Sequence, residues 1–162
     1  VIGDFDDAVA TLTTWTATGD FANPANADAW KGVSGGARIG ARAVSTCEMN
    51  GNSKGCDGST GTLTSPLFTV DAARPYLNFL MSGGSGDGSV GLNVLDAGGN
   101  VVASHAPNSC NQASISGSDN WVTLDLASRV GQQLRVQVFD NTSAGCGFVS
   151  FDHVYMGGAR RK

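Results

Sequence analysis

Short segments of alternating apolar and polar or small residues recur along the chain, each bounded by glycine, proline, asparagine or aspartate. Val90, Leu92 and Val94 follow this pattern, and residues 133–139 repeat it. A period of two places successive side chains on opposite faces of an extended strand, so each segment is expected to be half-buried in a sheet. The 23 glycines and the single glutamate, Glu48, suit turns better than helix interiors. The pattern therefore predicts an all-β protein.

Eight to ten strands are expected in one domain that spans residues 1–162, since no repeat or interdomain linker interrupts the pattern. Pro66 interrupts one candidate strand and predicts an edge or a bulge there. Residues 124–129 are expected to form one helical turn at most. The spacing of the turns is typical of an antiparallel β-sandwich. The candidate strands are residues 2–5, 13–18, 37–44, 61–70, 75–81, 89–95, 101–104, 120–126, 133–139 and 147–156.

Four cysteines allow three disulfide connectivities. We favour Cys47–Cys56, because this bond closes a short loop, and it leaves Cys110–Cys146 as the second pair. No Cys-x-x-Cys motif is present and the histidines lack zinc-finger spacing, which argues against a zinc site. Two disulfides indicate an oxidising compartment, so we expect a secreted or cell-surface protein; the alternative is four free buried thiols in a cytosolic protein.

The charge distribution argues against nucleic acid as a partner. The formal net charge is −4, and the basic residues form no stripe apart from the C-terminal residues 159–162, which are expected to be a solvated end. No apolar stretch approaches the roughly 20 residues that a membrane span needs, so no membrane insertion is expected.

No motif in the sequence predicts catalysis. A Gly-x-Ser-x-Gly elbow and a phosphate-binding glycine loop are both absent. His105 and His153 have no obvious Ser and carboxylate partners, and a carboxylate pair of the glycosidase type is conceivable because aspartate is abundant. Most of these aspartates lie in turn sequences, where they have structural roles. We therefore do not expect an enzyme.

Aspartates near both ends of the chain suggest a metal site. Asp4, Asp6 and Asp7 cluster near the N-terminus, and Asp152 lies in the last candidate strand. Terminal strands of a sandwich often lie side by side, and Ca²⁺ binds carboxylate and carbonyl oxygens. A structural Ca²⁺ that joins the two ends, with Asp4, Asp6 and Asp152 as ligands, competes with the alternative that these carboxylates are solvated.

The three tryptophans differ in their expected environments. Trp15 and Trp121 lie in strand patterns and are expected in or near the core. Trp30 follows a polar loop and is the best candidate for an exposed ring that stacks on a sugar, although a tryptophan that closes a loop over the core is the commoner case.

Several segments carry a resemblance to a known family. Residues 61–70 read Gly-Thr-Leu-Thr-Ser-Pro-Leu-Phe-Thr-Val, and weaker matches occur in chain order at residues 4–6, 15–21, 77–84, 121–126 and 151–154. In this order they resemble the β-sandwich module appended to bacterial fructan-degrading enzymes of glycoside hydrolase family 32, which is similar to the family 66 carbohydrate-binding modules. The resemblance implies a jelly-roll-like sandwich, a non-catalytic sugar-binding role and a bound structural calcium.

Two segments depart from that family. The arginine that follows two valines in the family is Ala103 here, and the family's Gly-Gly-Trp-Gly-His-Ile loop has Cys146 in place of tryptophan and Phe148 in place of histidine. The resemblance therefore implies the fold without implying specificity for fructose.

A sugar site is expected at one end of the sandwich. A Cys110–Cys146 bond would tie residues 105–118 to residues 140–147, near the glycine-rich residues 82–88. Amides and carboxylates suit sugar hydroxyls, because each hydroxyl both donates and accepts a hydrogen bond. The alternative is that the disulfide only restrains the loops. The candidate sugar-binding residues are Asp87, His105, Asn111, Gln112, Asp140 and Asn141, with Asn108 beside them.

The sequence thus favours a carbohydrate-binding or lectin-like domain that targets a larger multidomain protein to polysaccharide or glycan. A structural or protein-binding domain of an adhesin or fibre is the alternative, and a hydrolase with an unrecognised carboxylate pair is the weakest hypothesis. Residues 141–143 also form an N-glycosylation sequon, which matters in a eukaryotic secretory pathway.

Overall fold

The computed structural model describes residues 1–2, 13–23, 26, 43–47, 55–110 and 120–161. Short 3₁₀ turns lie at Asp20–Ala22 (η1) and Ala127–Arg129 (η5). The strands within these residues are β1 (Thr16–Gly19), β2 (Val44–Ser45), β3 (Gly61–Thr64), β4 (Phe68–Thr69), β5 (Tyr76–Gly83), β6 (Val90–Asp96), β7 (Val101–His105), β8 (Trp121–Asp125), β9 (Gln133–Asp140) and β10 (Val149–Gly157).

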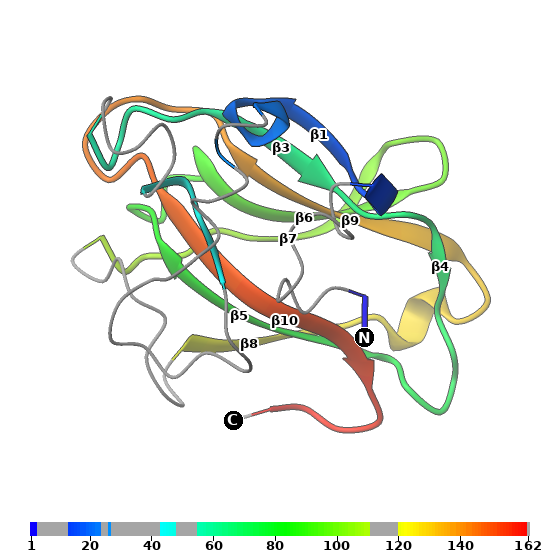
Figure 1. Cartoon of the computed structure of the whole chain (residues 1–162). Coiled ribbons are helices and arrows are strands. Elements are labelled where there is room, and N and C mark those ends of the chain that lie inside the picture. The colour runs from blue at the N-terminus through cyan, green and yellow to red at the C-terminus, as the bar shows by residue number, and fades with distance from the viewer. Residues whose placement is uncertain (3–12, 24–25, 27–42, 48–54, 111–119, 162) are drawn as a thin grey trace.

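The strands form two antiparallel sheets that pack face to face, and Figure 1 shows them as two layers. One sheet has the order β1-β3-β9-β6-β7, with β4 also paired to β9. The other has the order β2-β10-β5-β8. The chain changes sheet repeatedly between β4 and β10, as expected for a jelly-roll-like sandwich. The predicted all-β sandwich is confirmed.

The core fills the space between the sheets, and the alternating pattern supplies it. Leu92 pairs with Val138 and Val94 pairs with Val136 across β6 and β9, and all four side chains are fully buried. The facing sheet contributes the buried side chains of β5 and β10, and Trp15 joins the core from the residue just before β1. The buried cluster includes Trp15, Phe21, Val44, Leu63, Leu77, Phe79, Met81, Val149, Phe151 and Val154.

Several local predictions are confirmed. Pro66 separates β3 from β4, and the buried Ser65 beside it keeps the pairing with β9 by accepting from the Val136 N–H at 2.9 Å. The single helical turn within residues 124–129 is η5. The candidate strand 2–5, and residues 37–42 of another, lie largely outside the described residues.

The two ends of the described chain both lie on the side of the sandwich formed by the β10 sheet (Figure 1). The Ile2 N–H donates to the carbonyl of Val154 at 2.8 Å, so residues 1–2 lie beside the last strand. The structure also pairs the cysteines as predicted, Cys47 with Cys56 and Cys110 with Cys146. Within the described residues, no helix is long and apolar enough to span a membrane.

Candidate functional site

Three loops meet at the end of the sandwich where β5, β7 and β9 finish. Backbone hydrogen bonds join them: Gly84 donates to Phe148 at 3.0 Å, and Gly86 donates to Pro107 at 3.0 Å. Ser109 closes the set by donating to the carbonyl of Gly83 at 2.9 Å. The loop end, as we name residues 83–89, 106–110 and 141–148, is thus fixed by main-chain contacts between distant segments.

The disulfide Cys110–Cys146 adds a covalent link within the loop end, across a sequence separation of 36. Gly84 has a positive φ of 60°, and a Cβ there would lie 2.6 Å from the carbonyl oxygen of Pro107. Only glycine therefore allows the two loops to approach this closely. Gly84 therefore serves the close packing of these two loops.

The exposed polar groups of the loop end include Asp87, Asn108 and Asn141. The Asp87 carboxylate accepts from the N–H of Ser89 at 2.8 Å and from its hydroxyl at 2.6 Å. These hydrogen bonds from Ser89 lower the pKa of Asp87, so this side chain is an anion at neutral pH. The Asn141 N–H donates to the Ser89 carbonyl at 2.9 Å, which fixes the start of the sequon loop beside Asp87.

Two of the predicted sugar-binding residues have inward-facing environments. The ring of His105 lies 5.9 Å from that of Phe79 in an edge-on contact, and burial lowers the pKa of this imidazole, which is therefore neutral at pH 7. Asp140 is fully buried. Asn111 and Gln112 lie outside the described residues. The assignment of the six residues to a sugar site stays a prediction.

Asp140 ends β9 and belongs to a buried polar network. Its Oδ2 accepts from the Thr46 hydroxyl at 2.7 Å, and its Oδ1 accepts from the Thr142 N–H at 3.4 Å. Burial raises the pKa of Asp140 to about 7; the charges of Asp57 and Asp20 add to the rise, and these hydrogen bonds oppose it. A carboxyl group with a pKa close to neutral pH thus lies beneath the loop end.

The expected calcium ligands are only partly described. Asp4 and Asp6 lie outside the described residues. Asp152 is fully buried in β10, and its Oδ1 accepts from the His153 N–H at 2.7 Å. Within the described part of the chain, no three His, Cys, Asp or Glu side chains are close enough to hold a metal ion. A buried carboxylate next to the N-terminal segment suits Ca²⁺ chemistry, so calcium stays a proposal.

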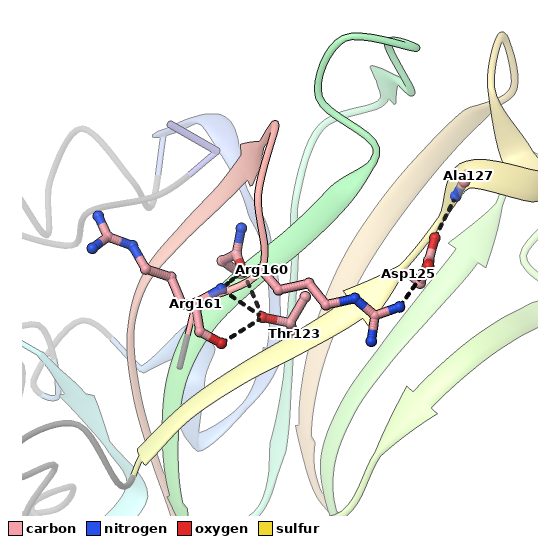
Figure 2. A network of polar contacts seen from close by, with 6 residues as sticks. Thr123, Asp125, Ala127, Arg160 and Arg161 are labelled. Carbon is pink, nitrogen blue, oxygen red and sulfur yellow. Dashed lines mark hydrogen bonds and ion pairs between the residues drawn. The ribbon is translucent and has the colours of Figure 1, made fainter.

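The C-terminal residues form a feature that the sequence did not predict. Arg161 lies against the rings of Trp121 and Tyr155, with its guanidinium carbon 5.2 Å and 5.8 Å from their centroids, and its Nε donates to the Tyr155 hydroxyl at 2.6 Å. Figure 2 shows Arg160 reaching Asp125, an ion pair of 2.8 Å, while the Arg161 backbone contacts Thr123. Arg160 and Arg161 are exposed, as expected of a solvated basic end, but they also contact aromatic rings and a carboxylate from distant strands.

The tryptophans follow their predicted environments where the structure describes them. Trp15 is buried in the main core, and Trp121 packs against a small second cluster formed by Ala43 and Leu80. Trp30 lies outside the described residues.

No family model matches this chain. A relative in Aspergillus rugulosus, ecdE, bears the name of a glycosyl hydrolase and is 29% identical over 151 residues. That similarity covers 90% of this chain but 19% of the relative, so this chain spans about a fifth of the relative's length.

Solved structures show weaker likeness. The K3 adhesin domain of Lys-gingipain from Porphyromonas gingivalis has a TM-score of 0.49 at 13% identity, covering 97% of this chain and 98% of that one. CsCBM6-3 from Clostridium stercorarium, solved with cellobiose, has a TM-score of 0.40 at 12% identity, covering 62% and 69%. Likeness at this level assigns no function to this chain.

Proposed function

We propose that this chain is a non-catalytic carbohydrate-binding domain of a secreted or cell-surface protein, and that it binds glycan at the loop end. The observation that carries this proposal is the joining of three loops by main-chain hydrogen bonds and by Cys110–Cys146. Loops fixed before binding lose little conformational entropy when a ligand arrives.

The chemistry of the loop end suits sugar hydroxyls. Asp87 offers a carboxylate acceptor, and the amides of Asn108 and Asn141 both donate and accept. All three side chains are exposed, so a ligand reaches them without rearrangement of the fold. His105 and Asp140, which the sequence also suggested, lie further inside, where they support the loops that carry the exposed groups.

The same geometry supports binding rather than turnover. A general acid or base must reach the bond that reacts, and the carboxyl group with a raised pKa, Asp140, is fully buried under the Thr46 hydroxyl. The relative that bears the name of a glycosyl hydrolase is much longer than this chain, which suits an accessory domain within a larger multidomain protein. Two disulfides suit an oxidising compartment.

Calorimetry with a panel of glycans tests this function. The panel includes levan, inulin, free fructose and other neutral polysaccharides, each with and without calcium. We expect binding to at least one of them. Asn108→Ala and Asn141→Ala should each weaken it by roughly threefold to tenfold, since each removes neutral hydrogen bonds. Gln133→Ala is the matched control, because Gln133 lies at the other end of β9.

Two results would contradict the proposal. Absence of binding to every glycan at millimolar concentration would favour the structural or adhesin alternative. Release of reducing sugar from any polysaccharide in the panel, lost on substitution of an aspartate pair, would instead make the domain a hydrolase.

A further inference from the structure

A row of uncharged polar side chains crosses the outer face of the six-stranded sheet. The strand register aligns one residue from each of five adjacent strands: β1 with β3, β3 with β9, β9 with β6, and β6 with β7. Their sequence neighbours Ala17, Leu63, Val138 and Val94 pack in or against the core, so the row faces away from it. The polar row, as we name it, consists of Thr16, Thr64, Gln137, Asn93 and Ser104.

The polar row is accessible and long. Thr16 and Ser104 at its two ends are exposed, and the three residues between them are partly exposed. Neighbouring strands lie about 4.8 Å apart, so the row spans roughly 19 Å. The amide of Gln137 donates to the hydroxyl of Thr64 at 3.1 Å, which orders the centre of the row.

A hollow of about 340 Å³ lies on the same face, between the polar row and the turn that joins β6 to β7. Thr16, Thr64, Gln137 and Arg135 line it, together with residues 95–99. The Nε of Arg135 is buried and has no hydrogen-bond partner among the described residues. A buried donor without a partner costs free energy, and a shift of the partly exposed Arg135 side chain toward the acceptor oxygen of a ligand would recover it.

The rim of this hollow is rigid. The Asp96 carboxylate accepts from the N–H of Asn100 at 2.9 Å and from its side-chain amide at 3.0 Å, which closes the turn between β6 and β7. The side chain of Asn100 lowers the pKa of Asp96, so the hollow has a carboxylate as well as the Arg135 guanidinium. The negative charge of Asp96 and the positive charge of Arg135 cancel, so the hollow has no net formal charge from these two side chains.

We propose that this face is a second binding surface, which takes an extended, uncharged glycan chain lying across the strands. The inference rests on the proposed carbohydrate-binding function and names its ligand class. Hydroxyl and amide groups match uncharged sugars, and a protein with a net charge of −4 disfavours polyanionic glycans. A single sugar cannot reach along a row of roughly 19 Å, so the surface needs an oligomer. Arg135 supplies the forked donor at one side of the chain.

The test measures affinity against chain length by calorimetry. The probes are inulin-type, cello- and xylo-oligosaccharides of increasing length, with the corresponding monosaccharides. For the oligomer series that binds, we expect affinity to rise at least about tenfold with length, with little dependence on salt. Arg135→Gln and Gln137→Ala should each remove most of that gain and leave the monosaccharide affinity unchanged. Arg129→Gln is the matched control, since Arg129 lies in η5, outside this face.

A second measurement uses the wild-type protein and so does not depend on the folding of any variant. Amide resonances of Thr64, Asn93 and Gln137 should shift on addition of the oligomer but not of the monosaccharide. Affinity that is independent of chain length, or unperturbed resonances in the polar row, would overturn the inference. If the monosaccharide still bound in that case, the proposed function would stand. Failure of every glycan to bind would overturn both.

Discussion

The hydroxyl of Thr46 donates a 2.7 Å hydrogen bond to the buried carboxyl of Asp140, across a sequence separation of 94. The same hydroxyl accepts from the Val149 N–H at 2.9 Å. One side chain next to the Cys47–Cys56 disulfide thus joins the last residue of β9 to the first residue of β10. The polar network under the loop end is therefore part of the fold, and its protonation should affect stability.

The first prediction concerns pH. Folding raises the pKa of Asp140 from 3.8 to about 7, so the folded state holds this proton more tightly than the unfolded state. The resulting stability is fully present below about pH 4 and is lost as the pH rises through 7; the loss is up to about 4 kcal/mol. Asp140→Asn should remove this dependence, as measured by urea unfolding at pH 4 and pH 8.

The control for this prediction is Asp87→Asn. Hydrogen bonds from Ser89 lower the pKa of Asp87. The stability that this carboxylate contributes therefore has the opposite pH dependence and is lost as the pH falls. If the wild-type protein and Asp140→Asn lose the same stability between pH 4 and pH 8, Asp140 does not have the raised pKa.

The second prediction separates the two disulfides. Replacement of Cys110 and Cys146 by serine opens a link across a sequence separation of 36, and should lower the free energy of unfolding by roughly 3–4 kcal/mol. It should also weaken glycan binding, because the loop end is then less ordered before binding. Replacement of Cys47 and Cys56, separated by 9 residues, should cost roughly 2–3 kcal/mol and keep binding. If binding were instead lost on replacement of Cys47 and Cys56 and kept on replacement of Cys110 and Cys146, the glycan site would lie away from the loop end.

The local features of the fold could be predicted from the sequence, because period-two alternation and turn residues act over a few positions. Residues 89–95 and 133–139 were expected to be strands, and they form β6 and β9. Leu92 and Val138 lie within these strands, and both are fully buried, as the alternation requires. Pro66 and the short Cys47–Cys56 loop were predictable for the same local reason.

The candidate site depends on register and burial, which the sequence does not display. The polar row consists of residues from five strands, and their alignment follows only from the pairing of those strands. Asp140 precedes Asn141 in what reads as a surface turn, yet it is fully buried. Arg161 reads as a solvated end and is exposed, and the sequence does not show that it also lies on the rings of Trp121 and Tyr155.

The third prediction concerns the C-terminal residues. Arg161→Ala removes the contact with the Trp121 ring and the hydrogen bond to the Tyr155 hydroxyl, and should lower the free energy of unfolding by about 1 kcal/mol or more. Arg160→Ala is the control and should have a smaller effect, because its ion pair with Asp125 is exposed and screened by solvent. Urea unfolding of both variants checks this. An equal or larger effect of Arg160→Ala would contradict the assigned role of Arg161.

The fourth prediction concerns calcium. If Asp152 is a ligand, added Ca²⁺ should raise the melting temperature and a chelator should lower it, because a ligand that binds only the folded state stabilises it. Asp152→Asn should abolish the response, whereas the exposed Asp125→Asn should retain it. A melting temperature that does not respond to Ca²⁺ in the wild-type protein would exclude the proposed calcium.

The most direct test of the glycan-binding proposal is a titration of the ¹⁵N-labelled protein with the glycan panel, followed by amide chemical shifts. We predict shifts that cluster at the loop end, at Gly84, Ser109 and Asn141, with resonances of the polar row joining them only for oligomers. Absence of shifts at millimolar concentration of every glycan, or shifts confined to residues far from both surfaces, would contradict the proposal.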